Sequence, residues 1–337
     1  MKGILYHISV IIVALTTLTA CSKNDSSDDG IGVDDLRVAF TLTMNYEQTR
    51  ASDGWGDYSP TDAGTEHECA INPSDIYIKL CDASGRVIGN VEDLQLSRIS
   101  QSQYAITGVW LKPGADLNRA KKVMIFANCG IAAKTNDIAD ISFNLTDTHD
   151  YIPMWGVTSV STLQLGKSND IGSIALLRAT AKVGVELRDD MAERGYSIGT
   201  LQLNGYNTMG YVLPLNYNQV AKTEYLKFEG TLHPLYSKAA DWLDFSQTGF
   251  CYIPEYNNTS ADASPSQIVV ELMRNGSYEG TYHLAFCSYN NGDPSSNLYD
   301  IQRNHYYRFV IYKEDDRLMV SLHVRDWFWR EHEDVIM

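Results

Sequence analysis

Short strand-like segments separated by turn residues run through the whole sequence, and they constrain its fold more than any other feature. Residues 36–52 read "LRVAFTLTMNYEQTRAS", and every second position there is apolar: Val38, Phe40, Leu42, Met44 and Tyr46. Because alternate side chains of a strand point to opposite faces, this pattern predicts a strand with one buried face. Alternating or continuous apolar runs predict further strands at 75–82, 121–130, 175–187, 200–206, 267–274, 281–289, 306–313 and 317–324.

Helical patterning is weak beside these strand signals, and only 189–196 and 238–245 favour one or two helical turns. Short strands joined by Gly, Asn, Asp and Ser turns are typical of antiparallel sandwiches rather than α/β enzymes. A turn signal at 169–172 precedes a long apolar segment. We therefore predict an all-β fold of two tandem antiparallel β-sandwich domains with few short helices, over 36–175 and 176–337. The turn-rich stretches 51–70 and 255–266 are expected to be surface loops.

The N-terminus has the features of a bacterial lipoprotein export signal. Lys2 precedes an apolar run at 8–20 that is too short to span a bilayer comfortably, and the run ends in Leu-Thr-Ala-Cys at Cys21. Residues 1–20 are expected to be a lipoprotein signal peptide, with Cys21 acylated and held by outer-membrane lipid. The alternative is an ordinary secretory signal with a chance cysteine. Residues 21–35 then form an acidic tether, similar to the surface-export signals of some lipoproteins.

Composition excludes several classes of function. The hydrophobic content of 44% supports packed cores, while a formal net charge of −15 argues against binding nucleic acid, whose phosphates demand a basic surface. Five cysteines beyond Cys21 show no CxxC spacing, so neither a zinc site nor a disulfide is predicted. Cys81 and Cys129 lie in or beside apolar runs, where a small buried side chain is the expected role.

No catalytic motif is found. GxGxxG, GxxxxGK[ST], GxSxG and HExxH are all missing, and the acidic and histidine residues at 330–335 alternate faces of a strand-like segment. We therefore expect no enzymatic activity, no metal and no cofactor; a hydrolase on a β-sandwich remains an alternative that a clustered acidic cleft would revive. The six tryptophans are expected in cores and loops, with a sugar-stacking platform as the alternative: Trp55, Trp110, Trp155, Trp242, Trp327 and Trp329.

Several segments in one order resemble the fimbrillin family, the type V pilins and related FimA-like and Mfa-like adhesins of anaerobic Gram-negative bacteria. Behind Cys21 and the strand 38–46, the resemblance rests on 75–89, 121–131, 151–156, 174–187, 250–256, 301–311 and 320–327. It implies two transthyretin-like sandwich domains, a fimbrial location at the outer membrane, and partnership with other fimbrial subunits. Host or bacterial surface ligands are further expected partners, and no enzymatic role is implied.

The resemblance also implies processing by an arginine-specific protease that removes the first strand of the precursor. Here it points to a cut after Arg50, with Ala51 as the new N-terminus; Arg37 is the second choice, but a cut there would leave the strand in place. Loss of the strand with Val38, Phe40, Leu42, Met44 and Tyr46 leaves an apolar groove with unpaired backbone groups, which a strand from another subunit can fill.

In the family the donor is the C-terminal strand. Here the apolar side chains first occupy even-numbered positions, at Leu318, Val320, Leu322 and Val324. They then change to odd-numbered positions, at Trp327 and Trp329, so a bulge near 325–326 is expected. The final segment, 330–337, carries charges on both faces and suits an apolar groove poorly. A repeating stalk role is therefore less favoured than a tip or accessory subunit. The alternative is a non-polymerising surface lipoprotein, either a fimbrial anchor or a glycan- or host-binding adhesin.

Overall fold

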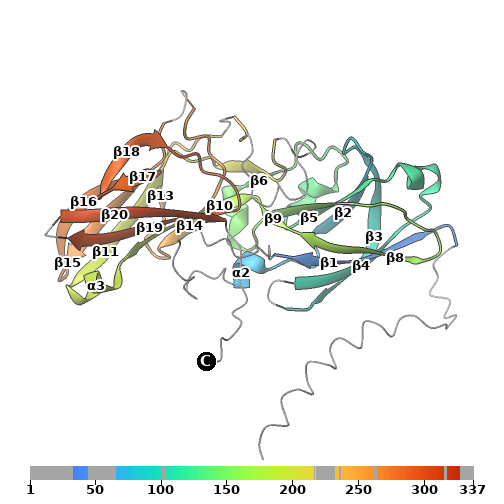
Figure 1. The fold of residues 1–337 in the computed structure, drawn as a ribbon, viewed down its shortest axis with the longest axis horizontal. Helices are drawn as coiled ribbons and strands as arrows, with labels where there is room; N and C mark the ends of the chain where they lie inside the picture. Colours follow the sequence, from blue (N-terminus) through green and yellow to red (C-terminus); the bar gives the residue numbers. More distant parts are fainter. Residues whose placement is uncertain are drawn as a thin grey trace, which may run out of the picture. The chain divides into compact units, whose positions relative to one another are not determined.

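The structure is a computed structural model that describes residues 33–44, 66–100, 103–215, 217, 232–234, 237–260, 264–314 and 317–326. It is mostly β and contains several sheets, as predicted (Figure 1). In the N-terminal half the elements are β1 Leu36–Thr43, α2 Glu66–Cys69, β2 Ile76–Cys81, β3 Val87–Arg98, β4 Gln103–Trp110, η2 Gly114–Arg119, β5 Lys122–Ala127, η3 Gly130–Lys134, β6 Ser142–Asn144, η4 Leu145–His149, β7 Met154–Ser159, β8 Ser168–Ala175 and β9 Leu177–Arg178.

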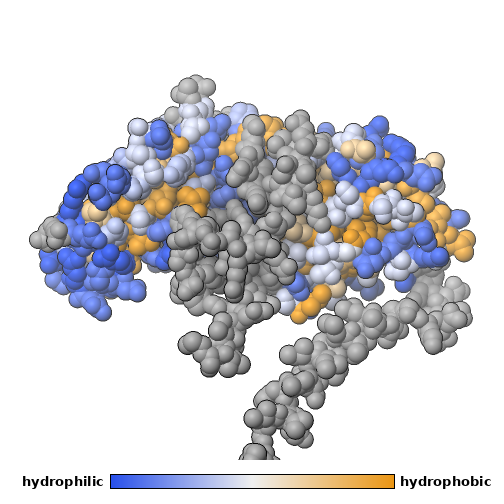
Figure 2. All heavy atoms as spheres, viewed as in Figure 1, coloured by the Kyte–Doolittle hydropathy of each residue, from blue (hydrophilic) through white to orange (hydrophobic). Residues whose placement is uncertain are grey.

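The C-terminal half continues the same pattern of short strands. Its elements are β10 Thr180–Leu187, α3 Asp189–Glu193, β11 Tyr196–Asn204, β12 Met209–Tyr211, β13 Leu243–Asp244, β14 Phe250–Pro254, β15 Gln267–Arg274, β16 Ser277–Ala285, β17 Cys287–Asn290, β18 Asp293–Leu298, β19 His305–Glu314 and β20 Arg317–Asp326. Hydrophilic side chains gather over the end that bears α3 (Figure 2), as the charged composition leads one to expect.

Eight strands of the N-terminal half form one sheet in the order β8-β1-β4-β3-β2-β5-β7-β9. One face of this sheet encloses the first hydrophobic core, to which β1, β2, β4 and β5 each contribute alternate side chains. The C-terminal half contains two four-stranded sheets, β14-β10-β19-β20 and β13-β11-β15-β16, whose facing apolar side chains form the second core.

Two strand pairs depart from the expected antiparallel arrangement. β1 pairs in parallel with β8, and β10 pairs in parallel with β19. Parallel neighbours require a long crossover connection, and both pairs are separated by many intervening elements that supply one. Local alternation predicts that a segment is a strand, but it carries no information about the direction of the partner.

A third hydrophobic cluster covers the other face of the eight-stranded sheet. Phe126 and Trp155 belong to it, together with Val212, Leu213 and Leu232 from much later in the chain. The short strands β6 and β12 pair with each other beside this cluster. Residues 212, 213 and 232 therefore pack on a sheet that is built from strands between residues 36 and 178.

Three local expectations need correction. The predicted helix at 238–245 is not formed, because this segment runs antiparallel beside β11, with β13 paired to it and the Ala239 N–H donating to Tyr206 O. The predicted surface loop 51–70 ends in α2, where Glu68 and Cys69 are fully buried, and residues 51–65 lie outside the described residues. In the predicted loop 255–266, Glu255, Asn258 and Ser266 are buried. Polar residues in both loops make buried hydrogen bonds, which hydrophobic patterning cannot reveal. The other predicted helix, at 189–196, is present as α3.

The described cysteines are five free, buried thiols: Cys69, Cys81, Cys129, Cys251 and Cys287. Burial raises the pKa of Cys81 to about 12. The expected packing role of Cys81 and Cys129 is confirmed, since both belong to the third cluster. Trp110 and Trp155 are also buried, as expected, whereas Trp242 keeps 46% of its surface exposed.

Candidate functional site: the first strand and its slot

β1 is an interior strand of the eight-stranded sheet, although it begins the folded chain. It pairs antiparallel with β4 from Leu36 to Thr43, and in parallel with β8 from Arg37 to Thr43. Its backbone is thus hydrogen-bonded along both edges. We call the space between β4 and β8 that β1 fills the first-strand slot, because no other strand lies between these two.

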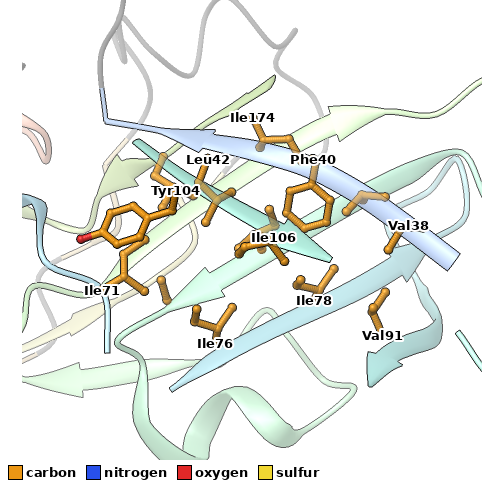
Figure 3. Close-up of a cluster of buried hydrophobic side chains, with 14 of the residues drawn as sticks. Val38, Phe40, Leu42, Ile71, Ile76, Ile78, Val91, Tyr104, Ile106 and Ile174 are labelled. Carbon is orange, nitrogen blue, oxygen red and sulfur yellow. The ribbon is translucent and has the colours of Figure 1, made fainter. Parts of the chain in front are cut away.

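The inward face of β1 closes the first hydrophobic core. Leu36, Val38, Phe40, Leu42 and Met44 are each at most 4% exposed. Figure 3 shows Val38, Phe40 and Leu42 pointing toward side chains of the neighbouring strands, including Ile78, Val91 and Ile106. The predicted alternation is therefore confirmed for the first four of the five apolar positions, and Tyr46 lies outside the described residues.

Polar contacts hold β1 at both ends. Before the strand, Asp35 Oδ1 accepts the Lys112 N–H at 2.9 Å, and Asp35 O accepts the Gly166 N–H at 3.1 Å. Within it, Asn169 Nδ2 donates to Arg37 O at 3.0 Å, and at its last residue the Leu176 N–H donates to Thr43 O at 2.9 Å. These contacts set the register of the strand in the slot.

The helix α2 links the rim of this core to the C-terminal half. Glu68, on α2, forms an ion pair with Lys182 of β10, with 2.7 Å between Oε1 and Nζ. The Tyr252 hydroxyl on β14 donates to the same carboxylate oxygen at 2.8 Å. The Lys182 ammonium lies 4.7 Å from the ring centroid of Phe250 and 4.9 Å from that of Tyr306, and such contacts favour the cation. We call Glu68, Lys182, Tyr252 and Arg178 the α2 clasp.

Arg178 completes the α2 clasp on its other side. Its side chain is 1% exposed, and its Nε donates to Glu68 O at 2.9 Å while Nη2 reaches Cys69 Sγ at 3.5 Å. The Tyr104 hydroxyl, from β4 beside the first-strand slot, donates to Cys69 O at 3.1 Å. Burial raises the pKa of the Cys69 thiol, and the Arg178 charge opposes that rise. One short helix therefore contacts both the slot strand β4 and the second half of the chain.

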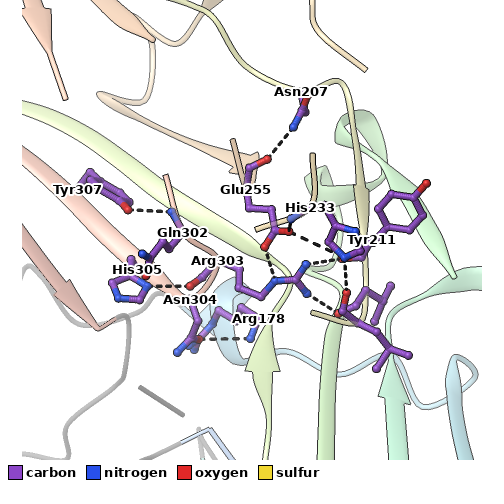
Figure 4. A network of polar contacts seen from close by, with 12 residues as sticks. Arg178, Asn207, Tyr211, His233, Glu255, Gln302, Arg303, Asn304, His305 and Tyr307 are labelled. Atoms are coloured by element: carbon purple, nitrogen blue, oxygen red, sulfur yellow. Dashed lines mark hydrogen bonds and ion pairs between the residues drawn. The ribbon is translucent and has the colours of Figure 1, made fainter. Parts of the chain in front are cut away.

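A second buried polar network lies around Arg303 (Figure 4). Arg303 Nε pairs with Glu255 Oε2 at 2.7 Å, and its two terminal nitrogens donate to Val212 O and Tyr211 O at 2.6 Å and 3.0 Å. Glu255 Oε1 accepts the His233 N–H at 3.1 Å. The network joins residues near 211 and 233 to the C-terminal sheets, and its satisfied charges make it a structural centre rather than an open site.

His233 is held between this network and a backbone carbonyl. Its Nε2 lies 3.0 Å from Leu213 O, so this nitrogen carries the proton, and its ring stacks on Tyr211 with 4.5 Å between centroids. Burial lowers the pKa of His233, partly offset by the hydrogen bond to Leu213 O and by Glu255. The imidazole is therefore neutral at physiological pH.

The candidate donor residues lie on β20, at the edge of a four-stranded sheet, where β19 is its one partner among the described strands. Val320 is buried, and Leu318, Leu322 and Val324 are partly buried against the second core. All four thus share one face, as their parity indicates. In this structure they complete their own sandwich. Trp327 and Trp329 lie outside the described residues, and so do Cys21, Arg50 and Ala51.

Within the described ranges, no helix is both long and apolar enough to cross a membrane. The same residues hold no group of three or more His, Cys, Asp or Glu side chains placed for a metal ion. The site is therefore described entirely by strand pairing, apolar packing and the buried ion pairs.

Sequence patterns did not reveal the α2 clasp or the Arg303 network. Hydrophobic patterning assigns charged residues to the solvent-exposed surface. Glu68 and Lys182 are partners that lie 114 positions apart in the chain, and Glu255 and Arg303 lie 48 positions apart. The available signals were Arg178 and Lys182, two cations within the largely apolar segment 175–187.

The family model for the fimbrillin-A associated anchor proteins Mfa1 and Mfa2 matches residues 35–333. Among solved structures, the chain is similar to the tip fimbrial protein Mfa3 from Porphyromonas gingivalis, solved with a C-terminal truncation. That similarity has 14% identity and a TM-score of 0.51, over 87% of this chain and 100% of that one. A candidate cell adhesion protein from Bacteroides eggerthii aligns at 13% identity and TM-score 0.48, over 87% and 96% of the two chains. A search of curated proteins returns no match.

The family match over residues 35–333 defines a fimbria-associated protein of the cell surface, in a family without enzymatic function. The chain belongs to the fimbrillin-A associated anchor protein family of Mfa1 and Mfa2. The resemblance to the fimbrillin family is thereby confirmed, and membership implies association with other fimbrial subunits. The likeness to Mfa3 supports the fold alone.

Proposed function

We propose that the chain is a structural subunit or tip adhesin of a cell-surface fimbria that is assembled by exchange of its first strand. Residues 1–20 direct export, and Cys21 carries outer-membrane lipid in the precursor. The folded part comprises two tandem transthyretin-like domains, 36–175 and 176–337. An arginine-specific protease then cuts between Arg50 and Ala51, which removes the strand and opens the first-strand slot.

The observation that carries this proposal is the position of β1 between β4 and β8. Removal of an edge strand would only shorten the sheet, whereas removal of β1 leaves a gap with a hydrogen-bonding strand on each side. The floor of that gap is the first core, now without Leu36, Val38, Phe40, Leu42 and Met44. A strand of similar alternation from a second subunit would meet apolar side chains below and backbone groups on both sides.

The energetics make such an exchange feasible. The five inward side chains correspond to about 8–15 kcal/mol of gross apolar burial, at about 1.5–3 kcal/mol each. Ordering the backbone of the 8 residues of β1 costs roughly 8–16 kcal/mol, at about 1–2 kcal/mol per residue. Because these quantities nearly cancel, the backbone hydrogen bonds along both edges decide how firmly the slot holds a strand.

Strand exchange also requires that the chain stays folded after cleavage, and the α2 clasp supports this. A cut after Arg50 falls before α2, and α2 stays bound through Glu68 to Lys182 and Tyr252. The trimmed chain therefore keeps α2 attached next to the open slot. Leu318, Val320, Leu322 and Val324 are the proposed donor region, together with Trp327 and Trp329.

Treatment of the precursor with an arginine-specific protease tests this function. The expected result is a single trimmed chain that begins at Ala51, followed by ladders of polymer on a gel loaded without heating. Arg50→Ala should remain full length and monomeric, and Arg37→Ala should behave like the natural chain. Polymer formed by Arg50→Ala, with residues 36–44 still present, would show that strand removal is unnecessary.

A fimbrial anchor is the second candidate, and the family description favours it. An anchor keeps its lipid at Cys21 and its own β1, and it caps the fibre rather than extending it. The bonding of β1 along both edges supports this role as well, since the uncut chain is complete by itself. Full-length protein that starts at Cys21 in purified outer membranes, with no trimmed form, would favour the anchor over the subunit.

A further inference from the structure

The sheet β13-β11-β15-β16 has one face on the second core and the other turned away from it. Leu201, Leu203, Ile268, Val270 and Leu272 point inward and are fully buried. The residues next to them along each strand therefore lie on the opposite face of the sheet. The side chains on that face are exposed or half-buried. We call this face the amide face; its members are Thr200, Gln202, Asn204, Asp244, Gln267, Val269, Glu271, Thr281, His283 and Ala285.

Trp242 lies at one corner of the amide face. Leu243, the residue after Trp242, pairs with Leu203 of β11. Ala239, three residues before Trp242, donates its N–H to Tyr206 O at 2.9 Å. Trp242 is bracketed by these two contacts, so it lies beside Asn204 in the antiparallel register. Because Leu243 packs against the second core, the alternation of the strand turns Trp242 to the other side. Its indole is 46% exposed there.

Asn204 brings an unused hydrogen-bond acceptor to the same corner. Its Oδ1 is shielded from solvent and has no hydrogen-bond partner among the described residues. Acceptors in this condition are uncommon in native proteins, and each calls for a reason. The terminal torsion of an asparagine is soft, so rotation of the amide can turn this oxygen toward a ligand. The backbone of Asn204 is held in place, because Asn204 pairs with Gln267 of β15.

The chemistry of the amide face is unusual for the surface of a chain with a formal charge of −15. Its members include no lysine or arginine and two carboxylates, those of Glu271 and Asp244, of which Asp244 accepts hydrogen bonds from Ser246. Gln202, Asn204 and Gln267 each offer two N–H donors and a carbonyl acceptor. The His283 ring nitrogen Nδ1 lies 3.0 Å from Gln267 Oε1 and orients that amide. A surface of amides, hydroxyls and two carboxylates, without cations, suits an uncharged ligand that is itself rich in hydroxyls.

We propose that the amide face binds a neutral saccharide. Trp242 stacks on the apolar face of one sugar ring, while Asn204 and Gln267 form hydrogen bonds with the ring hydroxyls. The proposal adds a ligand site to strand exchange, and it rests on the surface location proposed above. A single stacking residue implies weak binding at each site, which repeated subunits or clustered anchors on a cell would strengthen through multivalency.

The test uses the chain from Ser22 onward with a panel of neutral oligosaccharides, of glucose, galactose and mannose type, and their carboxylated counterparts. We expect at least one neutral series to bind. Trp242→Ala should weaken it by about tenfold, which corresponds to about 1.4 kcal/mol, and Trp242→Phe should recover part of the loss. Asn204→Ala should weaken the same series. The control is Leu111→Ala, which removes a side chain of similar exposure, 47%, from the other half of the chain.

Each alternative outcome contradicts the proposal. No binding to any neutral saccharide would overturn it, as would equal binding by the natural chain and Trp242→Ala. Equal losses in Trp242→Ala and Leu111→Ala would indicate non-specific apolar adhesion, and stronger binding to the carboxylated series would contradict the assigned ligand class. Trimming after Arg50 and polymer formation should be unchanged in Trp242→Ala, so failure of this proposal and failure of strand exchange can be told apart.

Discussion

Glu68 Oε1 and Lys182 Nζ lie 2.7 Å apart in a buried ion pair, although 114 positions separate the two residues in the chain. The pair joins α2, at the rim of the first core, to β10 in the second. Since the Tyr252 hydroxyl and the Phe250 and Tyr306 rings also contact the pair, its charges are well compensated. Stability of the chain and attachment of α2 should therefore depend on both partners together.

Removal of one partner of this pair should be costly. We expect Glu68→Ala to lower the free energy of unfolding by about 3–5 kcal/mol, because the Lys182 ammonium is left buried without its counter-charge. The double variant Glu68→Leu with Lys182→Met should lose much less, since neither charge then remains. Urea unfolding monitored by tryptophan fluorescence measures the unfolding free energies of both variants.

The matched control for that experiment is an exposed ion pair. Arg188 and Asp190 lie 2.7 Å apart with side chains 44% and 41% exposed, so Arg188→Gln should change the unfolding free energy far less than Glu68→Ala does. Similar losses in Glu68→Ala and Arg188→Gln would mean that the buried pair has no special role.

The inward face of β1 should carry the stability of the first core. Phe40→Ala in the uncut chain should cost about 3–5 kcal/mol, because a 4% exposed aromatic ring leaves a cavity. Thr41→Ala, one position along on the outer face, should cost less than about 1 kcal/mol. Chemical denaturation compares the two variants, and a larger loss for Thr41→Ala would contradict the assigned register.

Patterns along the sequence predicted local structure well where burial alternates. The strand 267–274 is observed with the same bounds as β15, and the alternation of Val38, Phe40 and Leu42 is observed as burial on one face of β1. Both follow from hydrophobic side chains at every second position, a signal that is contained within the strand itself.

Features that depend on distant partners were not predictable in the same way. β8 is a half-exposed strand with a weak pattern, and its position beside β1 follows only from the parallel crossover. Glu68 and Arg303 are buried because each has a matching charge far away in the chain. Trp242 was placed with the other tryptophans as a packing residue, and its exposure follows from a segment that lies beside β11 instead of forming a helix.

Stability should fall as the pH drops below neutral, partly through His233. Burial lowers the pKa of His233 in the folded chain, so the unfolded chain takes up a proton first, near the ordinary value of about 6.5. The stabilising contribution is complete above that pH, and it is lost as the pH falls toward the folded pKa. Unfolding free energies between pH 7.5 and 5.0 should decline more steeply in the natural chain than in His233→Gln. Identical slopes would show that the imidazole is not held neutral.

The five described cysteines should be unreactive in the folded chain. Each is buried, and burial raises the thiol pKa of Cys69 and Cys287 as it does that of Cys81, so little thiolate is present. With the chain from Ser22 onward, Ellman's reagent should detect almost no thiol under native conditions and all five in denaturant. Rapid reaction of one or more thiols before unfolding would contradict the burial described here.

The N-terminal sequence of the protein recovered from filaments on intact cells tests the central claim most directly. If a partner's strand replaces β1, the recovered chain begins at Ala51 and contains no peptide from residues 36–44. A filament-borne chain that begins at Cys21, with Val38, Phe40 and Leu42 still protected from proteolysis in their own core, would contradict strand exchange.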